Sequence, residues 1–213
     1  MPMRVAFLDL DHTLLAADSN QLWMAFLQSR QLISAAAMER HERFMDDYAN
    51  GVLDFEALQA FRTELDASLA PERLEQCLAV FQRDVLLPAV APLAPGLLSE
   101  LREQGLTTVV VSATRAPLVE PVARHLGVDH LLASCFGAQK VDRVEDWLRQ
   151  QGGSLAGLEQ SWFYSDSHND LPLLEAVSHP VAVDPDSRLA QLAADRQWPV
   201  ISLRQDIDQT ATA

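Results

Sequence analysis

The sequence predicts an α/β fold: a doubly wound parallel sheet, Rossmann-like in layout, with an all-helical cap domain inserted after the first strand. Two observations predict this arrangement. From residue 96 onward, short apolar or β-branched runs alternate with helical patterns, which is typical of a parallel sheet covered by helices. Between residues 16 and 87 the apolar residues recur at helical spacing only. We therefore expect a core domain from residues 1–15 and 88–213 and a cap domain from residues 16–87.

The first expected strand, residues 4–8, is a short apolar run that ends in two acids, Asp9 and Asp11. Burying two carboxylates at the end of a strand is costly unless a cation or hydrogen bonds compensate their charge. Mg²⁺ prefers carboxylate and carbonyl oxygen, and ligands of parallel sheets bind at the carboxyl ends of the strands. The pattern favours a Mg²⁺ site there, although a solvated acidic turn would also explain Asp-x-Asp alone.

The inserted segment predicts four amphipathic helices, which can form a small bundle with a core of its own. Asp18 or Ser19 caps the first, residues 35–48 form the second, Asp54 caps the third, and Pro71 opens the fourth.

A proline-rich linker, residues 88–95, leads back to the sheet. The later strands are expected at 106–111, 130–133, 161–164, 180–183 and 199–202, and the helices between them at 96–104, 117–126, 141–151, 171–177 and 187–195. The small polar residues 205–213 predict a frayed tail.

Composition narrows the function classes. The formal net charge is −14 at pH 7, which argues against broad contact with nucleic acid or an anionic membrane. It does not exclude a small phosphorylated metabolite, because a bound metal ion and one or two cations reverse the local field. The sequence shows no signal peptide and no apolar run that suits a membrane helix, and Cys77 and Cys135 form no metal or redox motif. We expect a cytoplasmic protein, of undetermined oligomeric state.

Four stretches, in order, resemble the signatures of the haloacid dehalogenase superfamily. They are Asp9-Leu10-Asp11-His12-Thr13, Val109-Val110-Val111-Ser112-Ala113-Thr114, Lys140 at a helix start, and Asp166-Ser167-His168-Asn169-Asp170. The resemblance spans nearly the whole chain. It is strongest to the phosphatase branch that includes phosphoserine phosphatase (subfamily IB), whose members carry a helical C1-type cap.

The resemblance implies a Mg²⁺-dependent phosphatase that forms an aspartyl phosphate on Asp9, with Asp11 as general acid and base. The implied metal residues are Asp9, Asp11 through its main-chain carbonyl, Asp166, and Asp170 in or near the second coordination sphere. The implied substrate- and phosphate-binding residues are Thr13, Ser112, Ala113, Lys140 and Asn169. Dehalogenases of the superfamily lack the second acid, so Asp11 favours phosphoryl transfer.

The sequence pattern itself, apart from the resemblance, supports a functional role for Lys140. It is the only lysine in the sequence, and a cation at a helix start opposes the helix dipole, so its placement needs another reason. For other residues a structural role stays open: Ser112, Thr114 and Asp170 would also serve as helix caps, and His168 as a solvated loop residue rather than a substrate contact. His12 is expected to point away from the metal.

Asp18 falls where phosphoserine phosphatases place an acid that meets the substrate's amino group. It favours an amine-bearing substrate such as phosphoserine or histidinol phosphate, although a helix cap explains it equally well. Arg115 is a further candidate contact. The segment before Lys140, residues 133–139, is shorter than the glycine-rich hairpin of related phosphatases. This keeps open a second interpretation, a catalytically weak or inactive binding or regulatory protein. A signalling receiver domain fits poorly, because receivers are shorter and lack a helical insertion.

Overall fold

The computed structural model describes residues 3–204; the expected tail at 205–213 lies outside them. The chain forms two compact units. One consists of the residues up to Asp18 together with those from Ala89 onward, and the other is Ser19–Pro88. No helix in the described range is long and apolar enough to cross a membrane.

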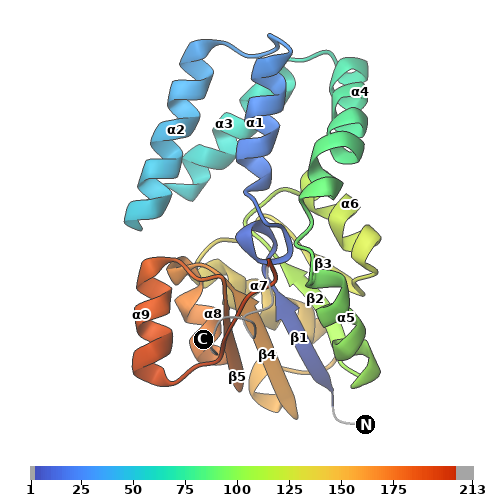
Figure 1. The fold of residues 1–213 in the computed structure, drawn as a ribbon, viewed down its shortest axis with the longest axis vertical. Coiled ribbons are helices and arrows are strands. Elements are labelled where there is room, and N and C mark those ends of the chain that lie inside the picture. The colour runs from blue at the N-terminus through green and yellow to red at the C-terminus, as the bar shows by residue number, and fades with distance from the viewer. Residues whose placement is uncertain (1–2, 205–213) are drawn as a thin grey trace, which may run out of the picture. The chain divides into compact units, whose positions relative to one another are not determined.

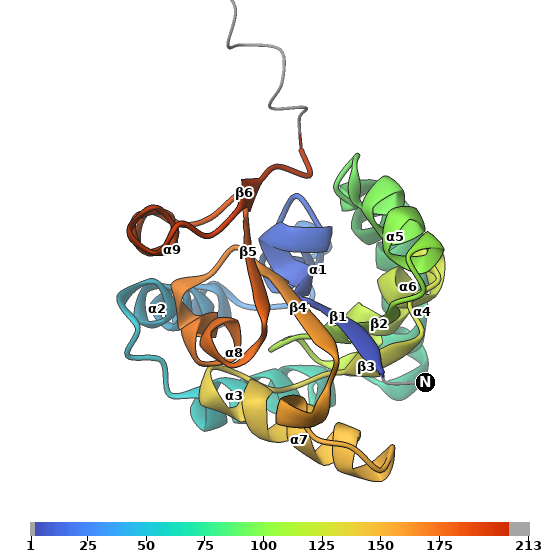
Figure 2. The ribbon, with the colours of Figure 1, turned by 90° about the horizontal axis from the view of Figure 1, so that it is seen from below.

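The first unit is built on a six-stranded, all-parallel sheet in the order β3-β2-β1-β4-β5-β6 (Figure 2). The strands are β1 (Arg4–Leu8), β2 (Thr107–Val111), β3 (His130–Leu132), β4 (Gln160–Ser165), β5 (His179–Val183) and β6 (Val200–Ile201). This confirms the predicted fold class. The strand order reverses between β1 and β4, so the side chains that follow these two neighbouring strands meet at one edge of the sheet.

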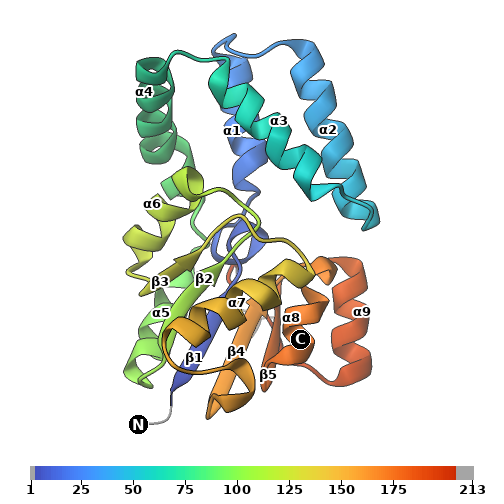
Figure 3. The same ribbon diagram turned by 180° about the vertical axis from the view of Figure 1, so that it is seen from behind.

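Helices cover both faces of the sheet (Figure 3). On one face lie α5 (Ala94–Glu103) and α6 (Ala116–Leu126), and on the other α7 (Ala138–Gln150), α8 (Leu171–Ala176) and α9 (Ser187–Arg196). Right-handed crossovers require this division, because the chain moves outward from β2 to β3 and then returns across the sheet from β3 to β4.

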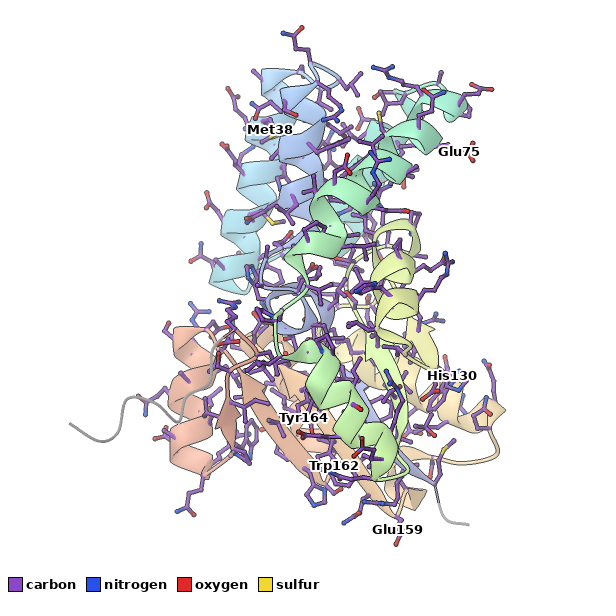
Figure 4. The ribbon with its side chains drawn as sticks, turned by 45° about the vertical axis from the view of Figure 1, so that its right-hand side comes forward. Met38, Glu75, His130, Glu159, Trp162 and Tyr164 are labelled. Carbon is purple, nitrogen blue, oxygen red and sulfur yellow. The ribbon has the colours of Figure 1, made fainter. Side chains whose placement is uncertain are left out.

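The alternation of side chains along each strand divides the core between these faces. Val5 and Phe7 pack toward α7 and α8, where the ring of Trp147 meets Phe7 edge to face. Trp162 and Tyr164, two positions apart on β4, lie on the α5 side (Figure 4). Strands buried on both faces read as nearly continuous apolar runs, which is why β1 and β2 were readable in the sequence.

The second unit contains α1 (Ser19–Ser29), α2 (Ala35–Asn50), α3 (Phe55–Ala67) and α4 (Pro71–Phe81) (Figure 1). The side chains of Ser34 and Asp54 cap α2 and α3. Gly51 ends α2 in a left-handed conformation, which glycine adopts without strain. The rings of Trp23, Phe26 and Phe81 pack together as part of its core.

Most expected elements are confirmed within one to three residues. Two differ. The helix that carries Lys140 begins at Ala138 rather than at residue 141, so Lys140 lies inside its first turn. The α-helical part of the fourth helix of the second unit ends at Phe81, and the chain continues helically as one wider π-helical turn, Gln82–Leu86, in place of the regular α-helix expected through Val85.

Candidate active site

Two acids follow the two central strands. Asp9 comes directly after β1, and Asp166 directly after β4. The Asp9 N–H donates to the Tyr164 carbonyl at 2.9 Å, which extends the pairing of the strands to the first acid. Asp9 and Asp166 are 7% and 9% exposed. Buried acids in this position need compensation from cations or hydrogen bonds.

A tight turn, Leu10–Leu14, follows Asp9 and carries Asp11 and Thr13. His12 has φ 57°, a left-handed conformation that is uncommon outside glycine, and the Leu15 N–H closes the turn onto the Leu10 carbonyl at 2.9 Å. Arg204 donates to the His12 carbonyl at 3.1 Å from outside. Such strained backbone is retained where the surroundings fix it, often at functional sites.

Thr13 contacts Asp166, the acid that follows β4. Its hydroxyl donates to Asp166 Oδ1 at 3.2 Å, and the Thr13 side chain is fully buried. Thr13 is expected from the resemblance to bind phosphate, and this contact gives it a different partner, a carboxylate. The first and fourth signatures, 153 residues apart in sequence, are joined by this bond.

Lys140 bridges two acids from different signatures. Its Nζ is 2.7 Å from Asp9 Oδ1 and 2.7 Å from Asp170 Oδ2. The Ser165 hydroxyl donates to the same Asp170 oxygen at 2.7 Å. Lys140 and Asp170 are each only 2% exposed. Two charge-assisted hydrogen bonds hold this buried lysine in one orientation and leave one of its three N–H donors for a further acceptor.

The sequence leaves open that Asp170 caps α8 with its side chain. The structure shows that it does not. It occupies the N-cap position without a side-chain cap hydrogen bond. Its carboxylate turns to Lys140 and Ser165 instead, because a buried charge is stabilised more by a buried ammonium group than by a single N–H.

The electrostatics of this cluster favour a further cation. Burial raises the pKa of Asp9 to about 7, although Lys140 beside it acts in the opposite direction. Burial and the neighbouring acids Asp9 and Asp170 raise the pKa of Asp166 well above its usual value. Burial alone would lower the pKa of Lys140, but the carboxylates of Asp170 and Asp9 outweigh it and raise the pKa. One ammonium group thus does not compensate all three buried acids.

The end of β2 contributes a hydroxyl pair. The Thr114 N–H donates to Ser112 Oγ at 3.0 Å, and Thr114 Oγ1 donates to Asp11 Oδ2 at 2.6 Å. Neither residue caps α6, whose N-cap is Arg115 and has no side-chain cap bond. The helix-cap alternative for Ser112 and Thr114 is therefore wrong. Thr114 is not among the predicted site residues, because nothing in the spacing of the sequence shows that β2 ends beside the turn that carries Asp11.

The short segment before Lys140 is attached to that same loop. The Ser134 N–H donates to the Thr114 carbonyl and the Cys135 N–H to the Ser112 carbonyl, both at 3.0 Å. Gly137 then turns the chain into α7 with φ 54° and ψ −127°, a conformation that side chains resist. These contacts and the turn at Gly137 lead the chain directly from β3 to the first turn of α7, where Lys140 lies.

The remaining predicted residues differ in their burial and in their partners. The half-buried Asn169 donates through its side chain to Ser167 Oγ at 3.4 Å. Asp18 and Ala113 are also half-buried. Both ring nitrogens of His168 have protein partners: Nδ1 is 2.8 Å from Asp186, and Nε2 is 3.1 Å from Arg188. These contacts favour a structural role for His168 over contact with substrate.

The donor set suits a hard divalent ion in part. Asp9 and Asp166 offer carboxylate oxygen, which Mg²⁺ prefers, from neighbouring strand ends. Within residues 3–204, no three His, Cys, Asp or Glu side chains form a metal-binding group. The expected set remains compatible with this, because it takes a main-chain carbonyl from Asp11 and places Asp170 behind the first ligands. The contact of Asp170 with Lys140 agrees with that outer position.

Comparison with known proteins identifies the family. The family model described as haloacid dehalogenase-like hydrolase matches residues 6–175. A histidinol-phosphatase from Neisseria meningitidis serogroup C is 32% identical over 219 residues, which cover 94% of this chain and 99% of that protein.

Solved structures show the same fold. A protein of unknown function from Bordetella pertussis Tohama I is 36% identical, covers 95% of this chain and 100% of its own, and superposes with a TM-score of 0.85. A phosphoserine phosphatase solved as a phospho-aspartyl intermediate analogue covers 97% of this chain and 96% of its own, with a TM-score of 0.64. At 15% identity this second likeness concerns the fold. The chain belongs to the haloacid dehalogenase-like hydrolase family, in which it is a phosphatase.

Proposed function

We propose that the protein hydrolyses a small phosphomonoester with an amine-bearing alcohol, such as histidinol phosphate or phosphoserine, with Mg²⁺ as cofactor and a phosphorylated Asp9 as intermediate. The observation that carries the proposal is the bridge of Lys140 between Asp9 and Asp170. It fixes one oxygen of Asp9 and leaves the other, Oδ2, as the nucleophile. The 32% identity to a histidinol-phosphatase of matching length supports the substrate class.

The reaction takes two displacements at phosphorus. In the first, Asp9 Oδ2 forms a bond to phosphorus, the bond from phosphorus to the ester oxygen breaks, and Asp11 gives its proton to the leaving alcohol. In the second, Asp11 takes a proton from water, the water oxygen bonds to phosphorus, and the bond to Asp9 breaks. Inorganic phosphate leaves and both acids return to their starting states.

Neighbouring residues prepare these steps. Thr114 donates to Asp11 Oδ2 and so orients the acid, whose other oxygen, Oδ1, carries the transferred proton. Lys140 and the hydroxyl of Ser112 face the phosphoryl oxygens as charge develops on them. Asp9, Asp166 and the Asp11 carbonyl would hold Mg²⁺, which would supply charge neutralisation at the phosphoryl group. Asp170 positions Lys140.

We propose that the unit Ser19–Pro88 serves as the cap that selects substrates, and that the protein works in the cytoplasm. Its two cysteines, Cys77 and Cys135, are free and buried, as expected of structural thiols in a reducing compartment. The acidic net charge of −14 favours a small ligand over nucleic acid.

The test is hydrolysis of p-nitrophenyl phosphate by the wild type and by Asp9→Asn, each with Mg²⁺ and with EDTA. We expect Mg²⁺-dependent turnover in the wild type and none in Asp9→Asn. Asp142→Asn, the same chemical change at an exposed position of α7, is the matched control and should retain activity. A panel of histidinol phosphate, phosphoserine and neutral sugar phosphates then ranks substrates by kcat/KM.

A folded wild type that hydrolyses none of these compounds would overturn the proposal. It would favour a binding or regulatory protein on a phosphatase fold. The short segment before Lys140, residues 133–139, would then be the first region to mutate in search of the cause of inactivity.

A further inference from the structure

A single residue outside the family signatures attaches the Asp166 loop, which follows β4, to the loop after the neighbouring strand β5. Asp186 lies between β5 and α9, and its N–H donates to the Asp166 carbonyl at 2.8 Å. Its Oδ2 accepts from the His168 N–H at 2.7 Å. The loop that follows β4 is thus held at both ends of a three-residue span, 166–168, by one aspartate.

The side chain of His168 adds a third attachment. Its Nδ1 is 2.8 Å from Asp186 Oδ2, and its Nε2 is 3.1 Å from Arg188 Nη1. A guanidinium group has donors only, so Nε2 accepts and Nδ1 carries the hydrogen that it donates to Asp186. The imidazole is therefore a fixed bridge between Arg188 and Asp186 rather than a group available to substrate.

The other oxygen of Asp186 is used as well. Oδ1 accepts from the Arg188 N–H at 2.9 Å and the Leu189 N–H at 2.8 Å, which caps α9. A helix cap of this kind has a fixed direction, because two N–H groups of the first turn define it. Asp186 is therefore fixed in position by α9, and through its bonds to residues 166 and 168 it fixes the loop that carries Asp166.

We propose that Asp186 is a positioning residue for Asp166, which holds the metal-binding carboxylate in place through the main chain of residues 166–168. This inference rests on the proposed Mg²⁺ site. Asp166 is held from two sides: Thr13 contacts its carboxylate at 3.2 Å, and Asp186 contacts its carbonyl. Partners of this kind behind a metal ligand typically change metal affinity about 10- to 100-fold when they are mutated.

Asp186→Asn separates this role from the helix cap. Asparagine caps helices as well as aspartate does, so its oxygen keeps Arg188 and Leu189, and its NH₂ group then faces the two donors of His168. The cap survives while the loop attachment becomes repulsive. Asp54→Asn is the matched control: Asp54 caps α3 through a 2.9 Å bond to the Ala57 N–H and belongs to the other unit.

The experiment is a calorimetric titration of the full chain with Mg²⁺ alone, without substrate, and hydrogen exchange of the peptide that contains residues 165–170. Asp186→Asn should raise the Kd for Mg²⁺ about 10- to 100-fold and speed exchange in that peptide, whereas Asp54→Asn should change neither. His168→Ala keeps the main-chain bond and should raise the Kd less.

The outcomes are separable from those of the proposed function. A Kd within twofold of wild type in Asp186→Asn, or an equal rise in Asp54→Asn, overturns the positioning role while the phosphatase assignment stands. A wild type that binds no Mg²⁺ overturns both. Excess Mg²⁺ that restores turnover in Asp186→Asn supports the role, because a defect in the chemical step would persist at saturation.

Discussion

Thr114 Oγ1 donates a 2.6 Å hydrogen bond to Asp11 Oδ2, across 103 residues of sequence. The bond joins the end of β2 to the turn after β1, two neighbouring strands of the sheet. A carboxylate that accepts a hydroxyl hydrogen on one oxygen has its other oxygen set in direction. The proposed general acid of the reaction is therefore oriented by a residue that belongs to no acidic motif.

Replacing Thr114 with valine, which has the same shape but no hydroxyl, should lower kcat for an alkyl phosphate about 10- to 100-fold, because Asp11 then transfers its proton less efficiently. The loss should be much smaller with p-nitrophenyl phosphate, whose leaving group needs little protonation. Steady-state kinetics on both substrates measure the difference. Thr114→Ser restores the donor and should restore most of kcat; an equal loss on both substrates would exclude this orienting role.

Lys140→Met should destabilise the protein as well as inactivate it. The substitution leaves Asp9 and Asp170 buried without their shared cation, and breaking a buried ion pair costs about 3–5 kcal/mol. Urea unfolding in EDTA measures the change in the free energy of unfolding. Arg149→Met, which breaks an exposed pair with Asp146, is the control and should cost at most about 1 kcal/mol. A similar cost for both variants would contradict the buried bridge.

Asp18→Asn tests recognition of the substrate's amino group. It removes one negative charge near the end of the first signature and should lower kcat/KM for histidinol phosphate and phosphoserine far more than for a neutral sugar phosphate. A salt-bridge partner of a charged ligand is worth about 10-fold or more in such a comparison. The measurement is the ratio of kcat/KM values for amine-bearing and neutral substrates. An unchanged ratio would remove Asp18 from recognition.

His41 makes the stability of the helical unit depend on pH. It is 4% exposed, and burial together with Arg62 lowers its pKa from 6.5 to about 4. Between these values the unfolded chain binds a proton that the folded chain does not. Stability is therefore fully present above about pH 6.5 and falls as the pH drops toward 4, by at most about 3 kcal/mol.

Thermal unfolding followed by circular dichroism between pH 4 and 7 measures this dependence. His41→Leu should flatten the slope of the midpoint in that range, because the residue at position 41 then takes up no proton on unfolding. His125→Gln, at an exposed histidine of α6, should leave the slope as it is. If the His41→Leu slope matches that of the wild type, other groups set the acid limit.

The sequence by itself determined the architecture of the chain. Periodicity separated the parallel sheet from the helical insertion, since strands buried on both faces and amphipathic helices have different repeats. The acids at the ends of two strands, together with a lone lysine at a helix start, indicated the edge of the sheet where Asp9, Lys140 and Asp166 lie. These features are local, and local spacing is what a sequence records.

Tertiary structure alone decided which residues meet. The partners of Thr13 and Thr114 are fixed by strand order, which brings the ends of β1, β2 and β4 together. Asp186 has the chemistry of an ordinary helix cap, and only the fold places the Asp166 loop against it. Hydrogen bonds act over about 3 Å, whereas these partners are separated by up to 153 residues along the chain, so their pairing exists only once the sheet has formed.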